Sequence, residues 1–247
     1  MESAVVPDAL RWGVGLLIIV VAAAFAAKRA LFLVELIRSG QKTAGHESTL
    51  PTKLEVEATE VLGQKKLLKW TVPGIAHVFV FIGFLILGIT VVEAFGEIFL
   101  HGFAFPIIGT WPIIRFLEDL FIVLVFIGVV IFLIIRYNDQ PKDKGRWSRF
   151  YGSHTSGAWL VLFMIVNVLW TLLLYRGAKI NLEEYDGDAE AAGMTGGWAS
   201  QAVAKLLAPL GPDTNAWLET IGLWLHVAVI LGFLVLVLNS KHLHIFT

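Results

Sequence analysis

The sequence predicts an all-α membrane protein: a single domain over residues 1–247 that forms a bundle of five transmembrane helices. Hydrophobic residues make up 57% of the chain and charged residues only 16%, and the mean hydropathy is +0.74. These values are too apolar for an ordinary soluble domain. Five segments also reach the roughly 20 apolar residues that one helix needs to cross the bilayer core.

The five apolar segments cover about 12–36, 72–95, 115–135, 155–175 and 217–238. The first is interrupted by Lys28 and Arg29, after which the apolar stretch ALFLVELI follows. We therefore expect this helix to leave the membrane there and to continue along the cytoplasmic face. Between residues 193 and 212, the stretch GGWASQAVAKLLAPLG predicts a short amphipathic helix on the outer face.

The distribution of cations predicts the orientation of the bundle. Lysines and arginines concentrate in two connections, between the first and second helices and between the third and fourth. Because cytoplasmic loops carry an excess of these residues, both connections are expected inside. The opposite side holds the acidic segment NLEEYDGDAE. The N-terminus is therefore expected outside and the C-terminus in the cytoplasm.

The composition also excludes several functions. A net charge of -1 gives no basic footprint for nucleic acid. The absence of cysteine excludes disulfides, thiolate zinc sites, covalently attached c-type haem and an iron-sulfur cluster bound by this chain. The sequence ends at NSKHLHIFT, directly after the fifth apolar segment. A truncated or fused partner domain and a naturally short C-terminus both account for this ending.

Histidines inside the apolar segments are the candidate functional residues. His77 lies about five residues inside the second helix and His226 about halfway along the fifth. His244 follows His226 by 18 positions, which is about 27 Å if the helix continues. Neutral imidazole is a strong axial ligand of haem iron, and histidines of two facing helices can bind one haem between them. The alternative is a buried histidine that is satisfied by a backbone carbonyl or a serine.

Two further features bear on a haem site. Glycines occur near both histidine levels, at Gly83 and Gly88 on the second helix and at Gly222 and Gly232 on the fifth. They would let a flat porphyrin approach the backbone, although glycine is common in membrane helices. Polar residues at mid-depth are few, chiefly His226, Asn167 and Thr171, which favours cofactor binding over transport.

The stretches AHVFVFIGF, HVAVILGF and SKHLHIF, together with the topology, resemble those of the gamma subunit of respiratory nitrate reductases. They resemble still more closely the membrane domain of heterodisulfide-reductase-type iron-sulfur oxidoreductases, including those that link electron-transfer flavoprotein to menaquinone. The resemblance implies a cytochrome b domain in a bacterial or archaeal cytoplasmic membrane. It implies that His77 and His244 bind a cytoplasmic-side haem b, and that His226 binds an outer one.

The sequence departs from this family at one ligand of the outer haem, where Leu87 stands ten residues after His77. The outer haem is therefore expected to be absent, to be five-coordinate on His226, or to use another ligand such as His101. The last case requires the stretch HGFAFPIIGTWP to fold back into the membrane. We favour a second haem with an atypical or missing sixth ligand, because His226 would otherwise be stranded in lipid.

Other polar residues have open assignments. His154, at the start of the fourth helix, is expected to bind the inner haem, to hydrogen-bond a quinone, or to cap the helix. His242 is an alternative to His244, which the spacing favours. Glu118 and Asp119 begin the third helix, where they either carry quinone protons or sit at a solvated helix N-terminus.

We therefore predict an electron-transfer module that carries electrons between a cytoplasmic iron-sulfur partner, separate or fused, and menaquinone or ubiquinone. Such a chain is expected to be the membrane part of a quinone-linked oxidoreductase, with one or two haem b groups as cofactors. The resemblance adds electron-transfer flavoprotein as a candidate electron source. The alternative is a cofactor-free membrane anchor or a small transporter subunit.

Overall fold

The computed structural model describes residues 6–41, 49–153, 155–185, 187, 197–240 and 243–244, and these contain helices and no strand. The α-helices are α1 (Asp8–Arg38), α2 (Leu50–Val56), α3 (Thr71–Phe99), α4 (Pro112–Asn138), α5 (Pro141–Lys144), α6 (Thr155–Tyr185), α7 (Trp198–Leu207) and α8 (Pro212–Leu238). A π-helical segment, η1 (Glu57–Leu62), follows α2. Three short 3-10 helices connect these elements, η2 (Leu67–Lys69), η3 (Gly145–Trp147) and η4 (Ala208–Leu210), and Leu243 and His244 are also in a 3-10 conformation.

The predicted bundle of five long apolar helices is confirmed. α1, α3, α4, α6 and α8 are each long and apolar enough to cross a membrane. Each begins and ends close to or beyond its predicted limits, and α6 extends furthest, to Tyr185 instead of residue 175. Some of the charged side chains in these extensions, such as Arg11, Glu97 and Lys179, find partners inside the bundle.

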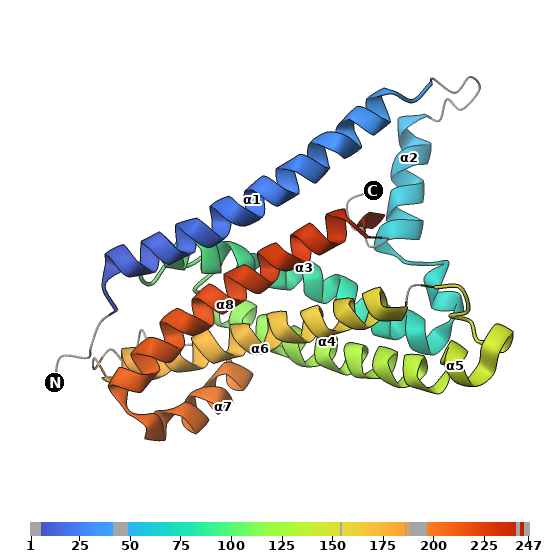
Figure 1. Ribbon diagram of the computed structural model, residues 1–247. Helices are drawn as coiled ribbons and strands as arrows, with labels where there is room; N and C mark the ends of the chain where they lie inside the picture. The colour runs from blue at the N-terminus through green and yellow to red at the C-terminus, as the bar shows by residue number, and fades with distance from the viewer. Residues whose placement is uncertain are drawn as a thin grey trace.

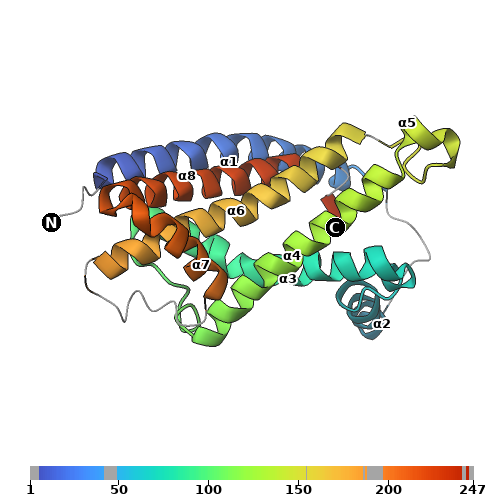
Figure 2. The same ribbon diagram turned by 90° about the horizontal axis from the view of Figure 1, so that it is seen from below.

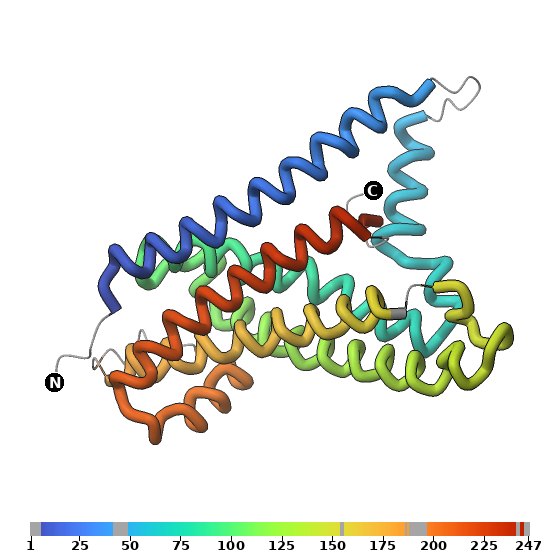
Figure 3. Tube along the Cα trace, viewed as in Figure 1, coloured from blue at the N-terminus to red at the C-terminus, as the bar shows by residue number. Residues whose placement is uncertain are grey.

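The long helices pack in two groups. Seen from below, α1, α8 and α6 lie side by side in one layer, and α3 and α4 form an antiparallel pair beneath it (Figure 2). α2 stands steeply between the end of α1 and the start of α3 (Figure 1). α1 continues without a break through Lys28 and Arg29 (Figure 3). Arg29 Nε donates to the carbonyl oxygen of Leu238 at the end of α8, 3.2 Å away.

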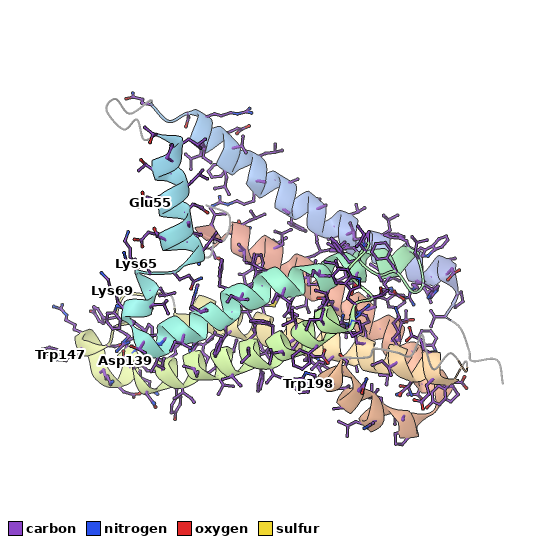
Figure 4. The ribbon with its side chains drawn as sticks, turned by 180° about the vertical axis from the view of Figure 1, so that it is seen from behind. Glu55, Lys65, Lys69, Asp139, Trp147 and Trp198 are labelled. Carbon is purple, nitrogen blue, oxygen red and sulfur yellow. The ribbon has the colours of Figure 1, made fainter. Side chains whose placement is uncertain are left out.

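The two ends of the bundle are named here after labelled tryptophans (Figure 4). The Trp147 end contains the end of α4 and the start of α3, and Lys65, Lys69 and Asp139 also lie there. The Trp198 end contains the start of α4 and the end of α3. Both cation-rich connections therefore meet at the Trp147 end, as the predicted topology requires.

Close helix contacts explain several glycines. A Cβ atom at Gly128 of α4 would lie 2.9 Å from the carbonyl oxygen of Ala76 in α3. At Gly222 of α8, it would lie 3.1 Å from the backbone of Tyr175 in α6. Gly83 likewise lies against Val125 of α4, so helix packing accounts for Gly83 and Gly222 without a porphyrin. Gly88 has open space around it.

The contrast between Gly128 and Gly88 predicts opposite effects of one substitution. Gly128→Ala forces α3 and α4 apart and should destabilise the protein by about 1 to 3 kcal/mol. Gly88→Ala should leave stability unchanged or raise it slightly, because alanine has the higher helix propensity. Thermal unfolding of the two variants in the same detergent measures both effects. Equal melting temperatures for the two variants would contradict the α3–α4 packing.

Candidate functional site

His77 is the first candidate residue, and its ring is held by a glutamine. It lies half-buried in the second turn of α3, and its Nδ1 is 3.1 Å from Gln64 Oε1. Because an amide oxygen can only accept, Nδ1 carries the hydrogen and Nε2 keeps its lone pair. Gln64 itself is only 7% exposed and has a positive φ of 46°, so the backbone is bent to bring this side chain inward.

His244 lies near His77, although not at the end of a continuous helix. α8 ends at Leu238, and the Asn239 side chain donates to the carbonyl oxygen of Val235, 2.8 Å away. Leu243 and His244 form a separate 3-10 turn, in which His244 is exposed. His244 is close enough to His77 for the two imidazoles to interact electrostatically. The two histidines thus lie in the same part of the molecule, and their binding to one haem stays a prediction.

His226 lies in the middle of α8 and is fully buried. Its Nδ1 is 3.0 Å from Thr171 Oγ1 of α6, and this oxygen is 2.6 Å from the carbonyl oxygen of Asn167. Because the hydroxyl hydrogen is given to that carbonyl, Thr171 accepts from Nδ1–H, and Nε2 keeps the lone pair. This buried Nε2 has no hydrogen-bond partner, and the Tyr175 ring lies beside the imidazole, with centroids 5.6 Å apart.

His77 and His226 each present one ring nitrogen, Nε2, that takes no part in the hydrogen bonds described above. Within the described ranges, no group of three or more histidine, aspartate or glutamate side chains is arranged to hold a metal ion. Haem iron needs only axial ligands from the protein, and protein ligands of this type usually donate their second ring N–H to a polar group. His77 and His226 both show this arrangement. Leu87, at the position where the resemblance would place another ligand, is part of the apolar core.

The remaining histidine candidates are placed differently. His101 follows the end of α3 and is exposed, and its Nε2 is 3.1 Å from Asp8 Oδ1. It is thus bonded at the surface of the Trp198 end and is not brought to buried His226. The loop after it does fold back, because the N–H of Phe105 donates to Glu93 Oε1 at 3.0 Å. His154 and His242 lie outside the described residues.

Charged side chains inside the Trp198 end form a first ion network. Arg11 of α1 binds both carboxylate oxygens of Glu219 in α8, each at 2.8 Å. It also donates from Nε and Nη2 to the carbonyl oxygen of Glu97 in α3, at 3.2 and 3.1 Å. Lys179 of α6 binds the Glu97 side chain at 2.8 Å. This network therefore contains two cations and two carboxylates.

A second ion network lies deeper and centres on Arg176 of α6, which is 1% exposed. Its Nη2 is 2.5 Å from Glu118 Oε2 of α4 and 3.4 Å from Glu93 Oε2 of α3. Arg115 Nη1 lies 3.2 Å from the same oxygen of Glu93 and 3.9 Å from Glu118 Oε2. Asp119 Oδ1 is 3.8 Å from Arg176 Nη1.

Asp119 also fixes the start of α7. Its carboxylate accepts from the backbone N–H groups of Ala199 and Ser200, at 2.7 and 2.9 Å, and from the Ser200 hydroxyl at 2.9 Å. A carboxylate from α4 thus caps the N-terminus of α7, where unpaired N–H groups and the helix dipole favour negative charge. The short helix predicted between residues 193 and 212 is confirmed as α7, Trp198–Leu207.

The sequence analysis missed both networks. It counted few polar residues at mid-depth and placed Glu118 and Asp119 at the start of a helix, where solvation was one option. Both carboxylates are 0% exposed, so the solvated alternative is wrong. The spacing of Glu93 and Glu97, four apart in the apolar α3, was the available signal, because such residues share one helix face.

A comparison with known proteins finds similarity to the probable iron-sulfur-binding oxidoreductase FadF of Bacillus subtilis (strain 168). The two sequences are 27% identical over 212 residues, which cover 85% of this chain and 28% of the relative. The chain therefore spans well under two thirds of the length of the relative that it matches. No family model matches the chain. No solved structure matches it either.

The cap on α7 leads to a stability prediction. Asp119→Ala leaves three donors at the start of α7 without their acceptor, which should cost about 1 to 3 kcal/mol. Hydrogen exchange should accelerate at the amides of Ala199 and Ser200 in particular. Asp143→Ala, which removes an exposed carboxylate at the Trp147 end, is the matched control. Unchanged exchange at α7 in Asp119→Ala would show that this cap does not hold the helix.

Proposed function

We propose that this chain is a membrane cytochrome b module, which carries electrons between an iron-sulfur partner and the quinone pool. One observation supports this most directly. His77 and His226, at two depths of the bundle, each bond through Nδ1 to a polar neighbour and keep an Nε2 lone pair for another group. A membrane anchor has no use for such histidines, because a buried polar atom without a partner costs free energy.

In this proposal, His77 and His244 would hold a haem b near the Trp147 end. Haem, when bound, supplies the one-electron chemistry. The protein holds the ligands in place: Gln64 accepts from His77 Nδ1 and so fixes both the ring orientation and the tautomer. Arg136 of α4 is buried with Nε and Nη2 unpartnered, and these donors suit an anionic group such as a haem propionate.

His226 is the proposed ligand of a second haem. Thr171 holds its Nδ1, and its Nε2 is the one buried imidazole nitrogen without a partner among the described residues. Leu87 supplies no ligand, and His101 is bonded to Asp8 at the surface. We therefore propose that His226 is the sole protein ligand of this second haem.

The proposed partner is an iron-sulfur protein or a fused iron-sulfur domain at the Trp147 end. FadF, a probable iron-sulfur-binding oxidoreductase, is much longer than the part that this chain matches. The cation-rich connections at the Trp147 end favour a cytoplasmic position for that end, in a bacterial or archaeal cytoplasmic membrane. Electron-transfer flavoprotein is the proposed electron source in the wider pathway.

A hollow at the same end supports the quinone part of the proposal. It has a volume of about 520 Å³ and lies between the start of α3 and the end of α4. Its lining includes the apolar residues Trp70, Val72, Pro73, Ile134 and Ile135 and the polar residues Thr71, Asn138, Asp139, Lys144 and Arg149. Pockets of this size with apolar walls and a few polar groups are typical of ligand sites. We propose it as the place where menaquinone or ubiquinone reaches the module.

The alternative is a cofactor-free anchor or a small transporter. The ion networks are one observation in favour of a transporter, because transport pathways contain buried charged residues. Most of these charges bind each other across helices at 2.5 to 3.4 Å, which ties the bundle together. Such pairing is what a structural role requires. The histidines remain unexplained by an anchor.

The first test of the proposal is an optical spectrum. The chain, purified from cells with full haem supply, should show the bands of reduced haem b after addition of dithionite. The haem-to-protein ratio, with the spin state, counts the sites: a low-spin haem for His77 and His244, and a high-spin haem for His226 alone. A colourless preparation would favour the anchor.

The second test assigns the ligands individually. His77→Ala and His244→Ala should each remove the same low-spin haem, and His226→Ala should remove the other one. His101→Ala, which changes an exposed histidine bonded to Asp8, is the control and should retain both signals. Loss of the low-spin haem in His154→Ala or His242→Ala, with the signal intact in His244→Ala, would overturn the His77–His244 pair.

A further inference from the structure

The second ion network contains more carboxylates than cations. Glu93, Glu118 and Asp119 are the three acids, and Arg115 and Arg176 the two bases, so full ionisation would leave one unbalanced negative charge inside the bundle. The first network, with two acids and two bases, is balanced. An uncompensated buried charge is costly, and one carboxyl group can avoid this cost by holding a proton.

The hydrogen bonds identify the group that holds it. Asp119 accepts three hydrogen bonds from α7, and such donors stabilise the ionised form. Glu93 binds the N–H of Phe105 through Oε1 and both arginines through Oε2. Glu118 differs from both: all its described partners reach Oε2, whereas its Oε1 is buried without a partner. Glu118 therefore accepts the fewest hydrogen bonds of the three acids, and one of its oxygens is free to carry a proton.

We propose that Glu118 is a neutral carboxylic acid in the resting protein and a reversible proton-binding site that exchanges with water at the Trp198 end. The proton leaves the Glu118 carboxyl for the Glu93 carboxylate, so that Glu118 becomes the carboxylate and Glu93 the acid. It then passes to Glu97 and from there to water. No electron moves in these steps.

The side chains lie in this order along the proposed route. Glu118 Oε2 and Glu93 Oε2 both bind Arg176 Nη2, at 2.5 and 3.4 Å, so the two carboxyl groups are adjacent. Glu97 lies one helical turn beyond Glu93 on α3. Glu97 also lines an open cavity of about 410 Å³ at the Trp198 end, together with Arg11, His101, Lys179 and Glu219.

The groups that face Glu118 come from three helices. They are Arg115 on its own helix α4, Glu93 on α3 and Arg176 on α6. Its neighbour Asp119 is directed to the backbone of α7. The proton-binding site is independent of haem, and only its use in quinone chemistry would rest on the proposed function. Infrared spectra can therefore test it in the protein with or without bound haem.

The test is pH-difference infrared spectroscopy of the full chain in liposomes. At neutral pH, the unaltered protein should show a carboxylic acid C=O band that shifts in D₂O and on labelling of glutamate with ¹³C. Glu118→Gln should abolish this band. Glu219→Gln, which makes the same change in the balanced network, should retain it. Glu118→Asp, which keeps an acid, should move the band from the glutamate label to an aspartate label.

Two results would overturn the proposal. One is a spectrum of the unaltered protein without any glutamic acid C=O band at neutral pH. The other is a band that persists in Glu118→Gln or keeps its glutamate label in Glu118→Asp. Because Glu118→Asp retains the acid, it also replaces Glu118→Gln if the amide variant does not fold.

Discussion

Buried ion pairs at the Trp198 end join all five long helices, and the remaining structure depends on this constraint. Arg11 links α1 to α3 and α8, and Arg176 links α6 to α3 and α4. Asp119 extends the same set of contacts to α7. Lipid offers no hydrogen bonds, so a fully buried charge such as that of Arg176 is satisfied inside the protein or not at all. Loss of one partner would leave the other buried and uncompensated, which is typically costly.

The number of long helices could be predicted from the sequence, because an apolar run of about 20 residues is the length that one helix needs to cross the bilayer core. The ends of the helices could not be predicted. Charged residues such as Glu97 and Lys179, each considered alone, indicate the solvated end of a helix. Their actual partners lie on other helices, 82 residues apart in this pair. No local pattern contains that information.

The candidate site was predictable only in part, because the sequence reveals a polar residue in an apolar helix but not its partners on other segments. His77 and His226 stand out in any apolar helix, and the resemblance paired His77 with His244, which the structure brings into electrostatic range. Their ligation stays a prediction. The partners that orient the rings, Gln64 and Thr171, were not predicted. Thr171 meets His226 only through the packing of α6 against α8, and Gln64 depends on an unusual backbone angle.

Gln64 has a mechanical consequence. It belongs to the polar segment that connects α1 to α3, and its side-chain oxygen accepts a hydrogen bond from the His77 ring inside the bundle. A displacement of that segment would lengthen or break this hydrogen bond and leave the His77 ring free to rotate. The polar segment at the surface therefore controls the orientation of the His77 imidazole and the direction of its Nε2 lone pair.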